Sequence, residues 1–255
     1  MSKEAVKTAH VDKFAAERLP APDTWPEFIF DAHVPPYPDQ LNAAEALLNN
    51  GFENRPAIYM NDLVWTYTEL NQKANQIAQI LTQDLNLMPG NRVLLRGGNT
   101  PMLAALWYGV LKAGGIVVTT MTMLREKELD AIIEVGQPDI LIIENDLPID
   151  VLESSKGKAK HVLSFNDIIT AMAVKNGEFE AVKTASGDVA LLAFTSGTTG
   201  LPKATMHFHR DILAMADSFA RYILNPSPED VFCGSPPLAF TFGLGGLLVF
   251  PARFG

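Results

Sequence analysis

Short apolar runs alternate with amphipathic stretches along most of this chain. The runs are of strand length and mostly apolar, and they occupy residues 92–96, 116–120, 140–143, 162–163 and 189–194. Helices are predicted at residues 101–112 and 125–135, each ending close to a glycine. Strands without a solvent face that alternate with helices favour an α/β fold, with a mostly parallel sheet and helices on both faces.

A further helix is predicted from its capping residues. Thr66, followed three positions later by Glu69, forms the sequence pattern of a capping box. The positions that follow at helical spacing give one apolar stripe: Leu70, Ala74, Ile77 and Leu81. We therefore expect an amphipathic helix that begins just after Thr66.

Residues 1 to about 40 differ from the rest of the chain. They contain six of its 17 prolines, at positions 20, 22, 26, 35, 36 and 38. Proline fixes φ and removes a backbone donor, so long regular structure is disfavoured there. We expect residues 1–40 to form an arm over the surface and residues 41–255 to form the folded part.

Composition excludes several classes of protein. With 47% hydrophobic and 19% charged residues among 255, the chain can bury a substantial core and is not disordered. Its single cysteine, Cys233, excludes a disulfide scaffold and a cysteine-only zinc site. A net charge of −9 argues against non-specific binding to nucleic acid or anionic lipid.

The best candidate for a membrane span is the stretch 101–123, in which Lys112 is the only charged residue. Its internal glycines and closing threonines favour a helix, a turn and a buried strand instead. The first forty residues mix both signs of charge and hold no apolar signal core. We therefore expect a cytoplasmic protein without a membrane span.

The stretch Thr195-Ser-Gly-Thr-Thr-Gly-Leu-Pro-Lys203 carries the strongest chemical signal. Four hydroxyl side chains, two glycines and one lysine follow an apolar strand directly. Glycines let backbone N–H groups face a ligand, hydroxyls donate to oxygens and lysine adds positive charge, so the loop suits a polyphosphate. The alternative is a polar surface turn. It is not a Walker A loop, because Ala204 stands where a magnesium-binding hydroxyl is needed.

This loop resembles the signature phosphate loop of the adenylate-forming superfamily, which includes acyl- and aryl-CoA synthetases, luciferases and peptide-synthetase adenylation domains. The stretch Thr66-Tyr-Thr-Glu-Leu70 and the helix after it are similar to an earlier motif of the family, and Ala113-Gly-Gly115 is similar to the next. The resemblance implies that ATP contacts a set of loop residues: Thr195, Ser196, Gly197, Thr198, Thr199, Gly200 and Lys203. Lys203 is the residue expected to stabilise phosphate charge.

A second segment, Pro236-Pro-Leu-Ala-Phe-Thr-Phe-Gly-Leu-Gly-Gly246, is glycine-rich and apolar. By itself it is compatible with a turn that leads into a core helix. In the family, the matching motif lines the pocket for the carboxylic acid, which implies that Phe240, Phe242 and Gly243 contact the substrate. An aromatic residue at 240 resembles the benzoate and 2-aminobenzoate CoA ligases, as do the segments Trp25–Phe28 and Leu41–Leu48. Flat apolar rings suit an aryl acid.

Two weaker candidates remain. His207 and His209 are two residues apart in a stretch that looks extended, so they could share a strand face. A metal site would need a third ligand, and structural or pocket-edge histidines are the alternative; in the family, a histidine matching His209 commonly follows the loop. The turn at residues 97–99 is either an anion-binding nest or a plain strand-to-helix connection.

The resemblance also implies what lies outside this chain. Family members are considerably longer, and their magnesium-binding glutamate, ribose-binding aspartate, hinge and catalytic lysine match nothing before Gly255. We therefore interpret the chain as an N-terminal fragment of the large domain, expected to be inactive alone.

The reaction implied is ATP- and Mg²⁺-dependent activation of a small aryl acid to an acyl-adenylate, followed by transfer to CoA. A fatty-acyl CoA ligase or another adenylate-forming enzyme, and a non-catalytic nucleotide-binding remnant, are the alternatives. A homodimer is left open.

Overall fold

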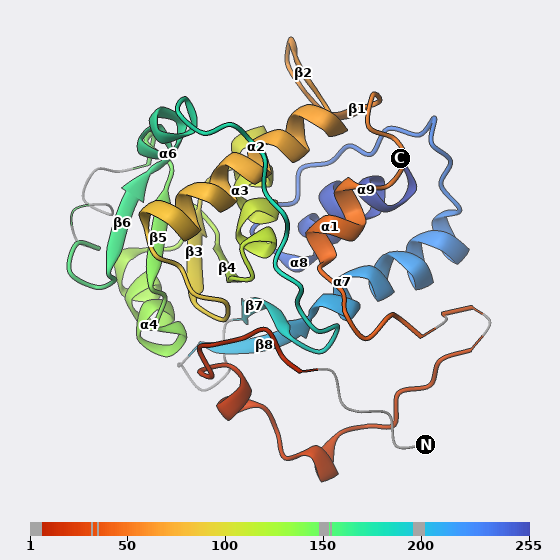
Figure 1. Ribbon diagram of the computed structural model, residues 1–255, viewed down its shortest axis with the longest axis horizontal. Coiled ribbons are helices and arrows are strands. Elements are labelled where there is room, and N and C mark those ends of the chain that lie inside the picture. The colour runs from red at the N-terminus through yellow and green to blue at the C-terminus, as the bar shows by residue number, and fades with distance from the viewer. Residues whose placement is uncertain (1–6, 32, 35, 148–152, 154, 196–201) are drawn as a thin grey trace.

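The computed structural model describes residues 7–31, 33–34, 36–147, 153, 155–195 and 202–255 (Figure 1). The described residues form a six-stranded sheet with the order β6-β5-β3-β4-β7-β8. All neighbouring strands are parallel except β8, which runs antiparallel to β7. The strands are β3 (Arg92–Arg96), β4 (Ile116–Thr120), β5 (Ile140–Ile143), β6 (His161–Ser164), β7 (Val189–Thr195) and β8 (Lys203–Phe208). The predicted α/β class and mostly parallel sheet are confirmed.

Helices cover both faces of this sheet (Figure 1). One face packs against a core shared by α1 (Ala43–Leu48), α2 (Tyr67–Gln79), α3 (Pro101–Lys112) and α6 (Phe165–Met172). The other face packs against α4 (Glu126–Gly136) in a second core. Alternate side chains of one strand enter the two cores, with Val93 and Leu95 in the first and Leu94 in the second. This explains why these strands show no polar face in the sequence.

The predicted capping box starts α2. Thr66 Oγ1 accepts a hydrogen bond from the Glu69 backbone N–H at 3.2 Å, and Glu69 Oε2 accepts one from the Thr66 N–H at 2.7 Å. All four residues of the apolar stripe are buried. After Gln79 the helix widens into a π-helical turn, η3 (Ile80–Asp84). Both the position and the buried face of this helix are therefore confirmed.

The apolar stretch 101–123 is a helix, a turn and a strand, as expected. Thr100 Oγ1 caps α3 by accepting from the Leu103 N–H at 3.2 Å, and Pro101 occupies the first helical turn. Gly114 ends the helix region with φ +74° before β4 begins. Among the described residues, no helix is long and apolar enough to cross a membrane.

An antiparallel hairpin was not predicted. Strands β1 (Pro56–Met60) and β2 (Leu63–Thr66) form their own two-stranded sheet, which projects beside α2 (Figure 1). Asn61 takes φ +53° in the connecting turn. The sequence did not predict this hairpin, because apolar residues of its strands, such as Tyr59 and Val64, are exposed. The strands therefore show no alternation of buried and exposed positions.

Between residues 7 and 40, the described residues form only two short 3-10 helices, η1 (Ala16–Arg18) and η2 (Pro22–Thr24). This segment is held at several points. Asp12 pairs with Arg92, whose guanidinium lies 4.3 Å from the centre of the Phe14 ring. Trp25 stacks on Phe208 of β8, with ring centres 5.6 Å apart. The division into an arm and a folded part at about residue 40 stays a prediction.

After β8, the only regular elements of the described chain are helices. After β8 come α7 (His209–Met215) and its π-helical continuation η4 (Ala216–Leu224), and after an irregular segment come α8 (Thr241–Leu244), η5 (Gly245–Val249) and α9 (Phe250–Phe254). Buried Asp217 joins these parts, because its carboxylate accepts from Arg221 at 2.8 Å, Arg253 at 2.9 Å and the Tyr37 hydroxyl at 3.0 Å.

Candidate functional site

The connections after β3 and β4 leave the sheet in opposite directions. The chain passes from β3 to α3 on one face and from β4 to α4 on the other (Figure 1). Open α/β sheets bind ligands where such neighbouring connections diverge, outside the carboxyl ends of the strands. The carboxyl edge of β3, β4 and β7 is therefore the place to examine.

The predicted phosphate loop is attached to this edge. Thr195 is the last residue of β7 and Lys203 the first of β8; the two residues pair, and Thr195 Oγ1 donates to the Lys203 carbonyl oxygen at 3.4 Å. Both side chains are exposed. Five candidates lie outside the described residues: Ser196, Gly197, Thr198, Thr199 and Gly200. The loop therefore connects two antiparallel strands, unlike a Walker A loop, which leads into a helix.

A buried arginine fixes the loop that follows β4. Arg96, at the end of β3, donates to the carbonyl oxygens of Met121 at 2.7 Å, Thr122 at 2.8 Å and Leu124 at 2.7 Å. Burial lowers the pKa of its guanidinium. A cation with five donors can hold several carbonyls at once, and it keeps this connection folded against the carboxyl edge.

The backbone of the turn at residues 97–99 binds a side-chain carboxylate of the same chain. The Gly98 N–H donates to Glu144 Oε2 at 2.7 Å. Glu144 directly follows β5, so this contact joins the connections after two neighbouring strands. The turn is therefore a strand-to-helix connection, and the alternative of an anion-binding nest for a ligand is wrong. The sequence could not reveal a partner 46 residues away.

The Pro236–Phe240 segment lies across the same edge. Asn99 Nδ2 donates to the Pro236 carbonyl oxygen at 2.9 Å, and Asn99 Oδ1 accepts from the Leu238 N–H at 2.7 Å. Thr119 Oγ1 donates to the Ala239 carbonyl oxygen at 2.8 Å. Val118 of β4 pairs with Leu192 of β7, so Thr119 lies beside the residue that follows Leu192. Thr195 is two residues farther along β7, which corresponds to roughly 7 Å along that strand. The segment is thus brought close to the start of the phosphate loop.

The three predicted acid-site residues occupy different surroundings. Phe240 and Phe242 are 45% and 73% exposed, so neither ring is part of the core. Gly243 is buried in α8, and a Cβ added there would stand 2.2 Å from the Pro237 carbonyl oxygen. Gly243 is therefore packed in the interior, whereas the rings of Phe240 and Phe242 are accessible at the surface.

The two histidines do not share a strand face, because β8 ends at Phe208 and His209 begins α7. Strand β8 ends at Phe208, whose N–H donates to the Asp211 carboxylate at 2.9 Å, and this contact starts α7 at His209. His207 stays on β8, with Nε2 2.9 Å from Thr205 Oγ1, and burial lowers its pKa. His209 is fully buried and its Nδ1 accepts from the Ala43 N–H at 3.1 Å; burial lowers its pKa to about 3.

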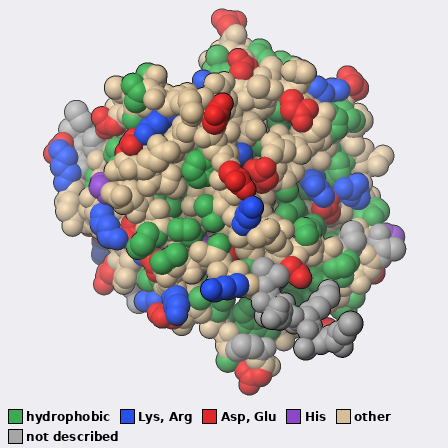
Figure 2. Space-filling model, in the orientation of Figure 1, with side chains coloured by type: hydrophobic (Ala, Val, Ile, Leu, Met, Phe, Trp, Pro, Cys, Tyr) green, Lys and Arg blue, Asp and Glu red, His purple; other side chains and the backbone are tan. Residues whose placement is uncertain are grey.

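Charged groups are distributed without a single-sign surface on the face shown in Figure 2, where Lys and Arg side chains are interspersed with Asp and Glu. Within the described part of the chain, no three His, Cys, Asp or Glu side chains come together to hold a metal ion.

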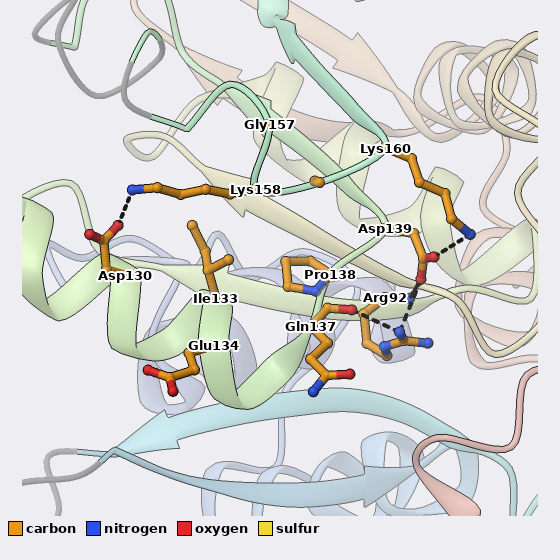
Figure 3. Close-up of a pocket in the computed structure, with 11 residues that line it drawn as sticks. Arg92, Asp130, Ile133, Glu134, Gln137, Pro138, Asp139, Gly157, Lys158 and Lys160 are labelled. Carbon is orange, nitrogen blue, oxygen red and sulfur yellow. Dashed lines mark hydrogen bonds and ion pairs between the residues drawn. The ribbon is translucent and has the colours of Figure 1, made fainter.

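A wide cavity lies at the opposite, amino edge of the sheet. It measures about 770 Å³ and lies between the end of α4 and the chain before β6. Most of its charged side chains are paired with one another (Figure 3): Lys158 pairs with Asp130 at 2.5 Å, and Asp139 pairs with both Lys160 at 2.8 Å and Arg92 at 3.1 Å. Polar groups that are paired internally offer little to a ligand, so this cavity is a weaker candidate than the carboxyl edge.

The described residues form an α/β fold in which Thr195, at the end of β7, and the Pro236–Phe240 segment lie at the carboxyl edge of one sheet. Residues 46–255 match the family described as AMP-binding enzyme, and the chain belongs to that family.

Three similar proteins illustrate the relationship. Benzoate–CoA ligase of Thauera aromatica is 26% identical over 230 residues, which make up 86% of this chain and 44% of that protein. The p-hydroxybenzoic acid–AMP ligase FadD22 of Mycobacterium tuberculosis is 31% identical over 218 residues, or 83% of this chain and 29% of that protein. The anthranilate CoA ligase AuaEII, solved in complex with anthranoyl-AMP, superposes with a TM-score of 0.78 at 26% identity, covering 86% of this chain and 43% of that one.

This chain therefore spans less than half the length of these relatives.

Proposed function

We propose that the complete gene product activates a carboxylic acid with ATP. The acid carboxylate attacks the α-phosphorus, pyrophosphate leaves, and an acyl-adenylate forms; the CoA thiol then displaces AMP to give the thioester. The observation that carries the proposal is that Thr195, where the predicted phosphate loop begins, and the Pro236–Phe240 segment lie at the same carboxyl edge of the sheet, in a chain that belongs to the AMP-binding enzyme family.

The phosphate loop is proposed to hold the β- and γ-phosphates. Charge accumulates on the phosphates as the α-phosphorus is attacked, so fixed donors there lower the barrier. Thr195 and Lys203, at the ends of the loop, stand on paired strands, and this pairing fixes where the loop begins and ends. Within the described residues, no carboxylate forms an ion pair with Lys203.

Magnesium is expected with ATP, and its charge would offset that of the phosphates. The described residues contain no cluster of carboxylates suited to hold it. No magnesium ligand is therefore assigned to this chain.

A small aryl acid is the proposed substrate. Phe240 and Phe242 present exposed rings on a segment held at the carboxyl edge, and aromatic faces bind flat apolar ligands. Support comes from the similar proteins, which include ligases for benzoate, p-hydroxybenzoic acid and anthranilate.

Acid-dependent ATP–pyrophosphate exchange tests the proposal, using benzoate, 2-aminobenzoate and a long-chain fatty acid. Exchange with the aryl acids alone supports it. Exchange with the fatty acid alone retains adenylation but overturns the aryl pocket. ATP binding without exchange for any acid identifies a nucleotide-binding remnant.

A further inference from the structure

The Pro236–Phe240 segment has no helix or strand of its own, yet most of its backbone is engaged. Pro236 and Pro237 lack an N–H, so the segment has few donors with which to fix itself. One internal bond closes a turn, from the Phe240 N–H to the Pro237 carbonyl oxygen at 3.0 Å. The remaining contacts that place it come from other elements.

Asn99 contributes two of these contacts, on either side of Pro237. Its amide donates to the Pro236 carbonyl oxygen and accepts from the Leu238 N–H, at 2.9 and 2.7 Å. A carboxamide carries its donor and its acceptor on two different atoms, so one Asn side chain can make both bonds at once. Asn99 itself sits in the turn that Glu144 holds through Gly98, so its position is fixed relative to the sheet.

Thr119 contributes the third contact, from within the sheet. It is 7% exposed on β4, and its hydroxyl donates to the Ala239 carbonyl oxygen at 2.8 Å. Ala239 precedes Phe240 directly, so this bond fixes the backbone from which the aromatic ring projects. The ring is 45% exposed, and therefore its own packing is incomplete.

We propose that Asn99 and Thr119 are positioning residues that set where Phe240 stands and thereby how tightly the acid substrate fits. The inference rests on the proposed function for its substrate and on the hydrogen bonds for its mechanism. Neither side chain is required to touch the reacting atoms; both act through the backbone of residues 236–240.

The test compares Thr119→Val and Asn99→Ala with matched controls in ATP–pyrophosphate exchange by the complete gene product. Thr120→Val removes a hydroxyl from the next residue of β4, where it bonds the Leu95 carbonyl oxygen instead. Asn145→Ala removes an amide that accepts the Asn166 N–H after β5, away from the segment.

Each test variant should raise the KM for the aryl acid about five- to thirtyfold, the factor expected for one or two net hydrogen bonds, while the KM for ATP stays unchanged. Thr119→Ser should restore the wild-type value, and both controls should match wild type. Equal changes in the two KM values, or no rescue by serine, would overturn the inference.

Amide hydrogen exchange provides a second readout that does not depend on activity. Asn99→Ala should speed exchange of the Leu238 amide about tenfold, and Asn145→Ala should leave it unchanged. An unchanged Leu238 amide in Asn99→Ala would overturn the positioning role. If the wild type adenylates no acid, the proposed function fails and the substrate part of the inference fails with it, while this exchange rate still decides whether the amide holds the segment.

Discussion

Gly243 is the position where a single methyl group should disturb the site most. A Cβ there would lie 2.2 Å from the Pro237 carbonyl oxygen and 2.8 Å from that of Pro236. In Gly243→Ala, either α8 or the proline pair must move by roughly 1 Å, because backbone carbonyls cannot rotate away as a flexible side chain would. That movement also strains the bonds from Asn99.

The expected cost is about 2–4 kcal/mol, the sum of overpacking at about 1–3 and one net hydrogen bond at about 1. With a urea m-value of about 3 kcal/mol/M, the midpoint of unfolding should fall by about 0.7–1.3 M.

Gly246→Ala is the matched control, since nothing lies within 4 Å of a Cβ there. A glycine to alanine change in an open helical position should be neutral or stabilising by about 0.5–1 kcal/mol. Equal midpoints for the two variants would refute the reasoning.

Three other changes have defined outcomes. In the complete gene product, Lys203→Ala should slow ATP–pyrophosphate exchange by about 10²–10³, the scale of losing one donor that stabilises charge; an unchanged rate would remove Lys203 from the site. Phe240→Ala should raise the KM for an aryl acid about tenfold and leave the KM for ATP nearly unchanged, whereas equal losses would place Phe240 outside the acid site. Burial lowers the pKa of His209 to about 3, so below pH 6.5 the unfolded chain binds a proton that the folded chain does not, and stability falls as the pH is lowered. His209→Asn keeps an acceptor for the Ala43 N–H without titrating, so its stability should fall by about 2 kcal/mol less than wild type between pH 7 and pH 5; equal falls in urea unfolding would show that His209 does not cause the dependence.

Much of the sheet could be predicted because burial on both faces leaves a direct mark on sequence. The inner strands contain apolar runs, such as residues 140–143, and α2 combines a capping box with a regular stripe. The β1–β2 hairpin carries no such mark, since its side chains are largely exposed and its pairing depends on a local turn at Asn61.

The site was predictable in its residue types but not in its contacts. The phosphate loop was predicted from local sequence, because its glycines, hydroxyls and lysine are consecutive, whereas Phe240 was assigned from the family resemblance; both roles stay predictions. Asn99, Thr119 and Glu144 were not, because their partners lie 46 to 139 residues away along the chain. His209 lies in the helix that follows the strand, because the Asp211 carboxylate accepts from the Phe208 N–H and so sets the start of α7. The sequence pattern did not show this boundary.

The central claim is that ligands bind at the carboxyl edge of β3, β4 and β7. Hydrogen–deuterium exchange of the complete gene product, with and without ATP and benzoate, locates binding directly. Binding at the carboxyl edge should protect residues 195–203 and 236–243, with no change around Arg92, Asp139 and Lys160 at the amino edge. Protection of the amino-edge cavity, with residues 195–203 unaffected, would contradict it.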